Sequence, residues 1–90
     1  MQLLVRNRVA DFATWREYLE ADRLPAAEYG LELVNLWQSM EDPNEVFFLL
    51  DVADVGRANA FMARPESRQI GEKSGVIDGS FCFLKPAWRR

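Results

Sequence analysis

Few side chains in this 90-residue chain could take part in catalysis or ligand binding, and the composition excludes several kinds of site. The sequence contains no histidine and a single cysteine, Cys82. Histidine is the commonest general base near neutral pH, so Ser-His-Asp and Cys-His catalysis are excluded. A zinc site needs several Cys or His ligands, and only one such residue exists. We therefore expect neither a metal site nor a bound cofactor.

The aromatic residues are the second group with a potential role. Trp15 and Trp37 could line an apolar pocket, with Tyr18, Phe61 and Phe81 as further wall. Aromatic residues at helical or strand spacing more often belong to a hydrophobic core. The sequence leaves both interpretations open, and the core is the favoured one.

Two arginines and the cysteine complete the candidates. Arg6 and Arg8 share one face of a predicted strand and could clamp an anionic ligand. The favoured alternative is pairing with Asp or Glu across the sheet or across a dimer seam. The sequence shows no base beside Cys82 that would deprotonate it to a thiolate. We therefore expect Cys82 to be a small, buried, apolar side chain.

These residues must be positioned by elements in the order β-α-β-β-α-β. Strands are predicted over 2–9, over 76–84, and on both sides of the turn Asp42-Pro43-Asn44 within 31–53. Asp11 and Asp54 are good N-caps for the two helices.

Both predicted helices are interrupted by a proline. Leu24-Pro25 breaks the first, and a short turn over 26–29 follows, ending at Gly30. Pro65 breaks the second, which restarts over 65–73 and ends at Gly75.

The third strand is apolar on both faces, which bears on assembly. Side chains alternate along a strand, so two sets of residues face opposite ways: Val46, Phe48, Leu50 and Val52 on one face, and Phe47, Leu49 and Ala53 on the other. The element order predicts an α+β, ferredoxin-like βαββαβ fold, a four-stranded antiparallel sheet with both proline-broken helices on one face. Nothing in the chain is left to cover the second face, so we expect a homodimer formed through it.

With these features the chain resembles the dimeric α/β-barrel superfamily, which includes the antibiotic-biosynthesis-type monooxygenases. The resemblance spans nearly the whole chain and is architectural. In that family two sheets pack face to face into a shared barrel, and each subunit has a pocket between its sheet and helices. The features that carry the resemblance are Asp11-Phe12 with Trp15, Gly30, the segment 41–46, Ala60-Phe61 and Ser74-Gly75-Val76.

The resemblance also points to Asn7. Some oxygen-using members carry a catalytic or ligand-contacting asparagine on the first strand, and Asn7 occupies that strand here. The histidine that accompanies it in the family has no counterpart, which counts against haem degradation. Asn7 could instead bond a strand end or a loop, and this is the favoured alternative. The predicted pocket comprises Asn7, Trp15, Trp37, Phe61 and Phe81.

Size, charge and cysteine content limit the number of domains, the kinds of partner and the cellular location that we expect. Ninety residues, 49% of them hydrophobic, make one domain, predicted over 1–86 with a tail over 87–90. A net charge of −3 argues against a nucleic-acid partner. The apolar stretch before Arg6 is too short for a signal peptide, and no run is long enough for a membrane span. With a single cysteine, a cytoplasmic protein is expected.

Three functional classes remain. One is a homodimer that binds a small apolar or aromatic molecule between sheet and helices without catalysis. Another is a cofactor-independent monooxygenase-like or isomerase-like enzyme acting on such a molecule. An RNA binder of similar topology is the third, but the aromatic sheet signature is missing and the charge is acidic. An acylphosphatase is excluded because the glycine-rich, arginine-containing loop is absent after the first strand. The sequence does not decide between binder and enzyme.

Overall fold

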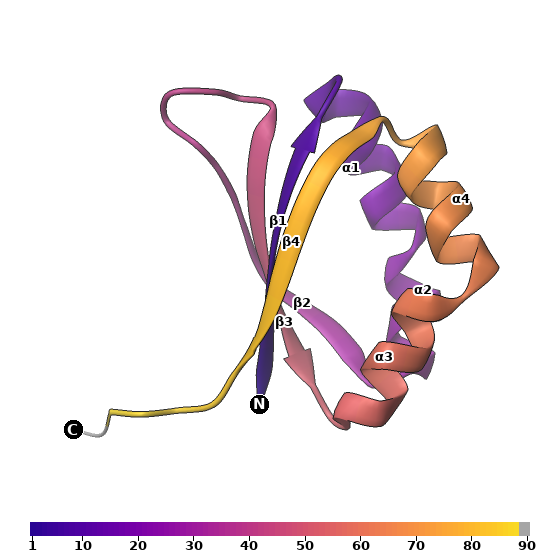
Figure 1. The fold of residues 1–90 in the computed structure, drawn as a ribbon, viewed down its shortest axis with the longest axis vertical. Helices are drawn as coiled ribbons and strands as arrows, with labels where there is room; N and C mark the ends of the chain where they lie inside the picture. The colour runs from indigo at the N-terminus through magenta and orange to yellow at the C-terminus, as the bar shows by residue number, and fades with distance from the viewer. Residues whose placement is uncertain (89–90) are drawn as a thin grey trace.

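The computed structural model describes residues 1–88, which form four strands and four helices in the predicted order (Figure 1). The elements in chain order are β1 (Gln2–Val9), α1 (Phe12–Ala21), α2 (Arg23–Glu28), β2 (Leu31–Gln38), β3 (Glu45–Val52), α3 (Val55–Ala63), α4 (Pro65–Lys73) and β4 (Val76–Leu84).

The strands form a single sheet in the order β2-β3-β1-β4, and each neighbouring pair is antiparallel. All four helices cover the same face of this sheet, whereas the tip of the β2–β3 hairpin and the C-terminal segment extend on the opposite side (Figure 1). The predicted ferredoxin-like arrangement, with β1 and β3 at the centre, is confirmed.

The core lies between the sheet and the helices in two adjoining clusters. One contains Leu3, Leu31, Val52, Ala58 and Phe61. The other contains Val9, Trp15, Val46 and Phe48. Alternate residues of β1 and β3, together with Leu31 of β2, supply the strand part of the clusters, as period-two side-chain alternation requires.

Local chemistry explains where the helices begin. The Asp11 carboxylate accepts a 2.9 Å hydrogen bond from the backbone N–H of Thr14, and Asp54 caps α3 in the same way through Arg57. Gly30 and Gly75 adopt φ values of 77° and 85°, the left-handed region that ends a helix at little cost for glycine.

The helix breaks differ in one detail from the prediction. Pro65 starts α4, as expected. The first break falls at Asp22, however, and Pro25 lies inside the first turn of α2 rather than between two helices. Proline is tolerated there because the first backbone N–H groups of a helix have no intrahelical acceptor.

The hairpin turn also anchors the start of α1. Asn44 donates its N–H to the Asp42 carboxylate at 2.9 Å. Its side-chain oxygen accepts from the N–H of Phe12, and its carbonyl accepts from the N–H of Val9. This turn therefore holds the β1–α1 junction in place.

The outer face of the sheet, turned away from the helices, carries apolar side chains that are exposed or half-buried. They are Leu4, Trp37, Phe47, Leu49, Cys82 and Leu84, assigned to this face by the pairing register. The expectation that Cys82 is buried is wrong, because it points outward from an edge strand and is exposed. No helix within residues 1–88 is long and apolar enough to cross a membrane.

Of the predicted tail, Trp88 is 76% exposed. Arg89 and Arg90 lie outside the described residues.

Candidate ligand cavity

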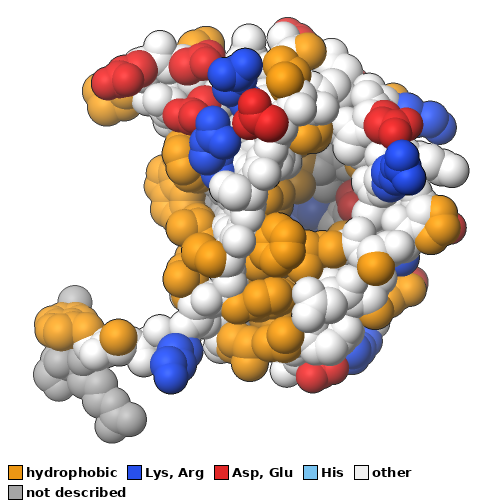
Figure 2. Space-filling view, viewed as in Figure 1, with side chains coloured by type: hydrophobic (Ala, Val, Ile, Leu, Met, Phe, Trp, Pro, Cys, Tyr) orange, Lys and Arg blue, Asp and Glu red, His pale blue; other side chains and the backbone are white. Residues whose placement is uncertain are grey.

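A cavity of about 660 Å³ lies between the helix-covered face of the sheet and the helices. The space-filling view shows the molecule hollowed there, beside a wall of apolar side chains (Figure 2). All four strands and all four helices contribute to its lining. The lining is mostly apolar and includes Leu3, Val5, Trp15, Leu19, Leu31, Leu33, Phe48, Leu50, Phe61, Met62, Ile70 and Val76.

Three of the five predicted pocket residues meet in this cavity: Asn7, Trp15 and Phe61. Trp15 is only 4% exposed and packs against Phe48 at 5.6 Å between ring centroids. Trp15 and Phe61 therefore belong to the core and to the cavity wall at once, because the cavity is bounded by core residues.

Trp37 does not line the cavity. It pairs with Phe47 on the outer face and is 45% exposed. Simple alternation from Leu31 and Leu33 would turn residue 37 toward the helices, but the β2–β3 register shifts between Leu33 and Asn35. Such an irregularity inserts one residue and reverses which side chains face the core, so Leu36 packs inward in place of Trp37.

Phe81 also lies outside the lining. It pairs with Val5 on the helix-covered side, but it sits on the edge strand β4 and is 54% exposed. Its ring packs edge-on against Phe83 at 6.1 Å. The five predicted residues therefore do not form one cluster.

Asn7 lines the cavity, and its side-chain oxygen lies beside Gly79 on β4. The two residues are register partners, and a β-carbon on Gly79 would overlap the Asn7 Oδ1 atom and lie 2.8 Å from the Arg6 carbonyl oxygen. Glycine at position 79 thus leaves the space that the Asn7 amide occupies. The sequence analysis did not single out Gly79, although glycine inside a strand often marks a close approach.

A second polar feature of the wall joins the two helix breaks. Asp22, between α1 and α2, forms an ion pair with Arg64, between α3 and α4, at 3.5 Å. The Arg64 guanidinium lies 3.9 Å from the centroid of the Phe61 ring. Burial raises the pKa of Asp22, and the charge of Arg64 opposes that rise.

Comparisons with solved structures place this architecture among known folds. A structure from Bordetella bronchiseptica, provisionally described as an antibiotic biosynthesis monooxygenase, matches with a TM-score of 0.79 at 14% identity, covering 97% of this chain and 96% of that one. A structure from Bacteriodes thetaiotaomicron with the same description matches with a TM-score of 0.71 at 20% identity, covering 96% of this chain and 88% of that one. A third structure with this description, from Deinococcus radiodurans, matches with a TM-score of 0.71 at 15% identity, covering 100% of this chain and 98% of that one.

This chain shares their fold. The resemblance drawn from the sequence is confirmed at that level, and identities of this size carry the fold alone. Neither protein-family models nor curated proteins yield a match.

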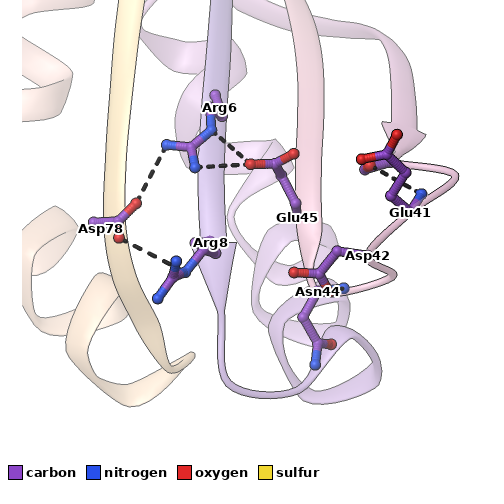
Figure 3. A network of polar contacts seen from close by, with 8 residues as sticks. Arg6, Arg8, Glu41, Asp42, Asn44, Glu45 and Asp78 are labelled. Atoms are coloured by element: carbon purple, nitrogen blue, oxygen red, sulfur yellow. Dashed lines mark hydrogen bonds and ion pairs between the residues drawn. The ribbon is translucent and has the colours of Figure 1, made fainter.

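The two arginines of β1, Arg6 and Arg8, lie on the outer face of the sheet and do not line the cavity. Arg6 donates to Glu45 Oε2 from Nε at 3.0 Å and from Nη2 at 2.8 Å, and to Asp78 Oδ1 at 3.3 Å (Figure 3). Arg8 Nε lies 3.8 Å from Asp78 Oδ2. The hydrogen bond to Glu45 is the main reason that the pKa of Arg6 is raised. Pairing across the sheet, the favoured alternative to an anion clamp, is what the structure shows.

The sequence analysis missed Asp22 and Arg64 as well as Gly79. A weak local signal existed for the first break, since Asp is a favoured residue at the start of a helix and proline is tolerated in the first helical turn. Nothing in the sequence pairs Asp22 with Arg64. Among residues 1–88, no group of three or more His, Cys, Asp or Glu side chains could hold a metal ion.

Proposed function

We propose that this protein binds a small, mainly apolar molecule in the cavity between its sheet and helices, and that it does so as a homodimer. The observation that carries the first part is the cavity itself. Its volume of about 660 Å³ falls in the range of small-molecule sites, roughly 300–1,000 Å³. Its lining is predominantly aliphatic and aromatic, which favours a ligand that buries apolar surface.

A few polar groups would orient such a ligand. Asn7 offers both an acceptor and donors from the middle of β1, at a point where Gly79 leaves room for the amide. An apolar pocket with one or two placed polar groups is the usual composition of a small-molecule site.

The outer face supports the homodimer. Trp37 is 45% exposed and Leu84 38% exposed on a face that no helix of residues 1–88 covers. Large apolar side chains left exposed on one face favour an interaction site there. A second copy packed on the same face would bury both patches symmetrically, and the hairpin tip and the C-terminal segment extend on that side (Figure 1).

An enzyme acting on the bound molecule is the second candidate. It is favoured by the position of Asn7 in the cavity and by the fold shared with proteins described as monooxygenases. Without histidine, such chemistry would depend on a substrate that stabilises its own carbanion, with the protein contributing orientation.

Native mass spectrometry of freshly purified protein tests the binding proposal and the dimer together. We expect twice the chain mass plus the mass of a retained small molecule. A monomer would refute the dimer.

Variants then test the cavity with 2-naphthol as a probe. We expect Asn7→Ala to keep the melting temperature while weakening 2-naphthol binding, and the exposed helix variant Glu17→Gln to change neither. Failure of the wild-type protein to bind any apolar probe would refute the cavity proposal. Oxygen uptake with the retained molecule added back separates enzyme from binder.

A further inference from the structure

Asp22 combines two properties that are rare in the cavity wall, a carboxylate charge and low exposure. Its side chain is 18% exposed, and the residue lines the cavity at the break between α1 and α2. The other carboxylates of the wall differ from it. Glu20 is exposed and pairs with Arg23 at 3.2 Å, and Glu32 is exposed. Asp22 is therefore the acidic group of the wall that a bound ligand would meet away from bulk water.

Arg64 holds this carboxylate without using its full capacity as an acceptor. Asp22 Oδ1 accepts from Arg64 Nη2 at 3.5 Å, which is longer than a usual N–H···O hydrogen bond. Arg64 makes shorter hydrogen bonds elsewhere, at 3.1 Å to the Ser67 hydroxyl and 3.1 Å to the Phe61 carbonyl. Within residues 1–88 no hydrogen bond reaches Asp22 Oδ2. An ionised carboxylate has about four acceptor positions, so several remain open.

The setting of the pair keeps it in place when a ligand enters. The Arg64 guanidinium is stacked over Phe61 at 3.9 Å and lies 5.6 Å from the centroid of the Tyr29 ring. Its side chain is 15% exposed. Because three sets of contacts fix the arginine, the carboxylate is presented from a rigid support.

We propose that Asp22 is the specificity-determining residue of the cavity, accepting a hydrogen bond from a neutral donor group, a hydroxyl or an amide N–H, on an otherwise apolar ligand. This inference rests on the proposed ligand-binding function and adds the chemical class of the ligand to it. A neutral donor fits because Arg64 already balances the charge of Asp22, so a cationic ligand would leave excess positive charge in a poorly solvated part of the wall. Burial raises the pKa of Asp22, which means that its charged form lacks solvation that a ligand donor would restore.

The experiment compares two probes that differ in one donor, 2-naphthol and 2-methoxynaphthalene, by isothermal titration calorimetry. We expect the wild-type protein to bind 2-naphthol at least about tenfold more tightly, as a hydrogen bond to a charged group implies. Asp22→Ala should bring this ratio close to one while leaving 2-methoxynaphthalene binding unchanged within about threefold. Asp22→Asn keeps the shape and loses the charge, so its ratio should fall between the two. Glu17→Gln, on the exposed side of α1, is the control and should keep the wild-type ratio.

The outcomes separate this inference from the proposed function. Binding of both probes with equal affinity by the wild-type protein would overturn the role of Asp22 and leave the cavity proposal standing. The same holds if Asp22→Ala keeps the preference for 2-naphthol. Binding of neither probe would refute the cavity proposal itself, and the present inference with it. Circular dichroism melts of each variant identify any loss that comes from unfolding.

Discussion

Placing a charge on the outer face of the sheet tests the proposed homodimer most directly. Leu4 lies near the centre of that face, with Leu49 on one side and Cys82 on the other as its register partners. Its neighbour Leu3 points to the opposite side and is 1% exposed in the core. Leu4→Arg should therefore spare the monomer core and act on the interface.

The magnitude follows from burial and symmetry. Full burial of a leucine side chain contributes about 1.5–3 kcal/mol. Leu4 is already half-buried within one chain, so the lower value, about 1.5 kcal/mol, applies to each copy. A two-fold dimer carries the substitution twice, giving about 3 kcal/mol, or a roughly hundredfold rise in the dimer dissociation constant. An unpaired arginine buried beside Arg6 adds to this cost, so a hundredfold rise is the lower bound.

The assay is size-exclusion chromatography with light scattering over a series of protein concentrations. We expect the wild-type protein to remain dimeric throughout and Leu4→Arg to be a poorly soluble monomer with an unchanged circular dichroism spectrum. Glu17→Arg places the same charge on an exposed helix position and should remain dimeric. If Leu4→Arg forms a dimer as stable as the wild type, the interface does not include this face of the sheet.

Three further predictions address other parts of the structure. Gly79→Ala should destabilise the fold by about 1–3 kcal/mol in urea unfolding and weaken 2-naphthol binding, because the added β-carbon overlaps the Asn7 amide. Gly71→Ala is the control for stability, since no atom lies within 4 Å of the carbon that it adds. Cys82 is exposed in the single chain and lies on the proposed interface, so alkylation by iodoacetamide should be slow in the wild type and fast in Leu4→Arg; equal rates would contradict the interface. Hydrogen bonds from the Thr14 N–H and hydroxyl lower the pKa of Asp11 in the folded protein. The stability that this cap provides is therefore fully present above the unfolded-state pKa of about 4. It is lost as the pH falls through the lower folded-state pKa. Asp11→Asn should flatten that part of the urea-midpoint profile, and an unchanged profile would show that the cap is not the titrating group.

The elements and their ends could be predicted from the sequence because each depends on residues close along the chain. Asp11 caps a helix three residues away, Pro65 starts one because its missing N–H is not needed there, and Gly75 ends one through its left-handed backbone. The two apolar faces of β3 likewise predicted a sheet with both faces covered, and the helices cover one of them.

The candidate site could be predicted only in part, for a reason visible in β2. Asn7, Trp15 and Phe61 share the cavity because the strand and helix periods orient them correctly. Trp37 does not, because the register shift near Asn35 reverses the facing of the residues that follow. A shift of this kind is set by pairing with β3, and composition alone does not reveal it.

By itself, the sequence determined the order of the elements, the aspartate caps of α1 and α3, the break at Pro65, the central place of β1 and β3, and the absence of histidine chemistry. These follow from short-range rules of backbone geometry and side-chain alternation. Tertiary structure alone decided the cavity, the outward position of Cys82 and the meeting of Asp22 with Arg64, 42 residues apart. Each of these depends on how elements distant in the chain pack together, and the free energy of that packing belongs to no single segment.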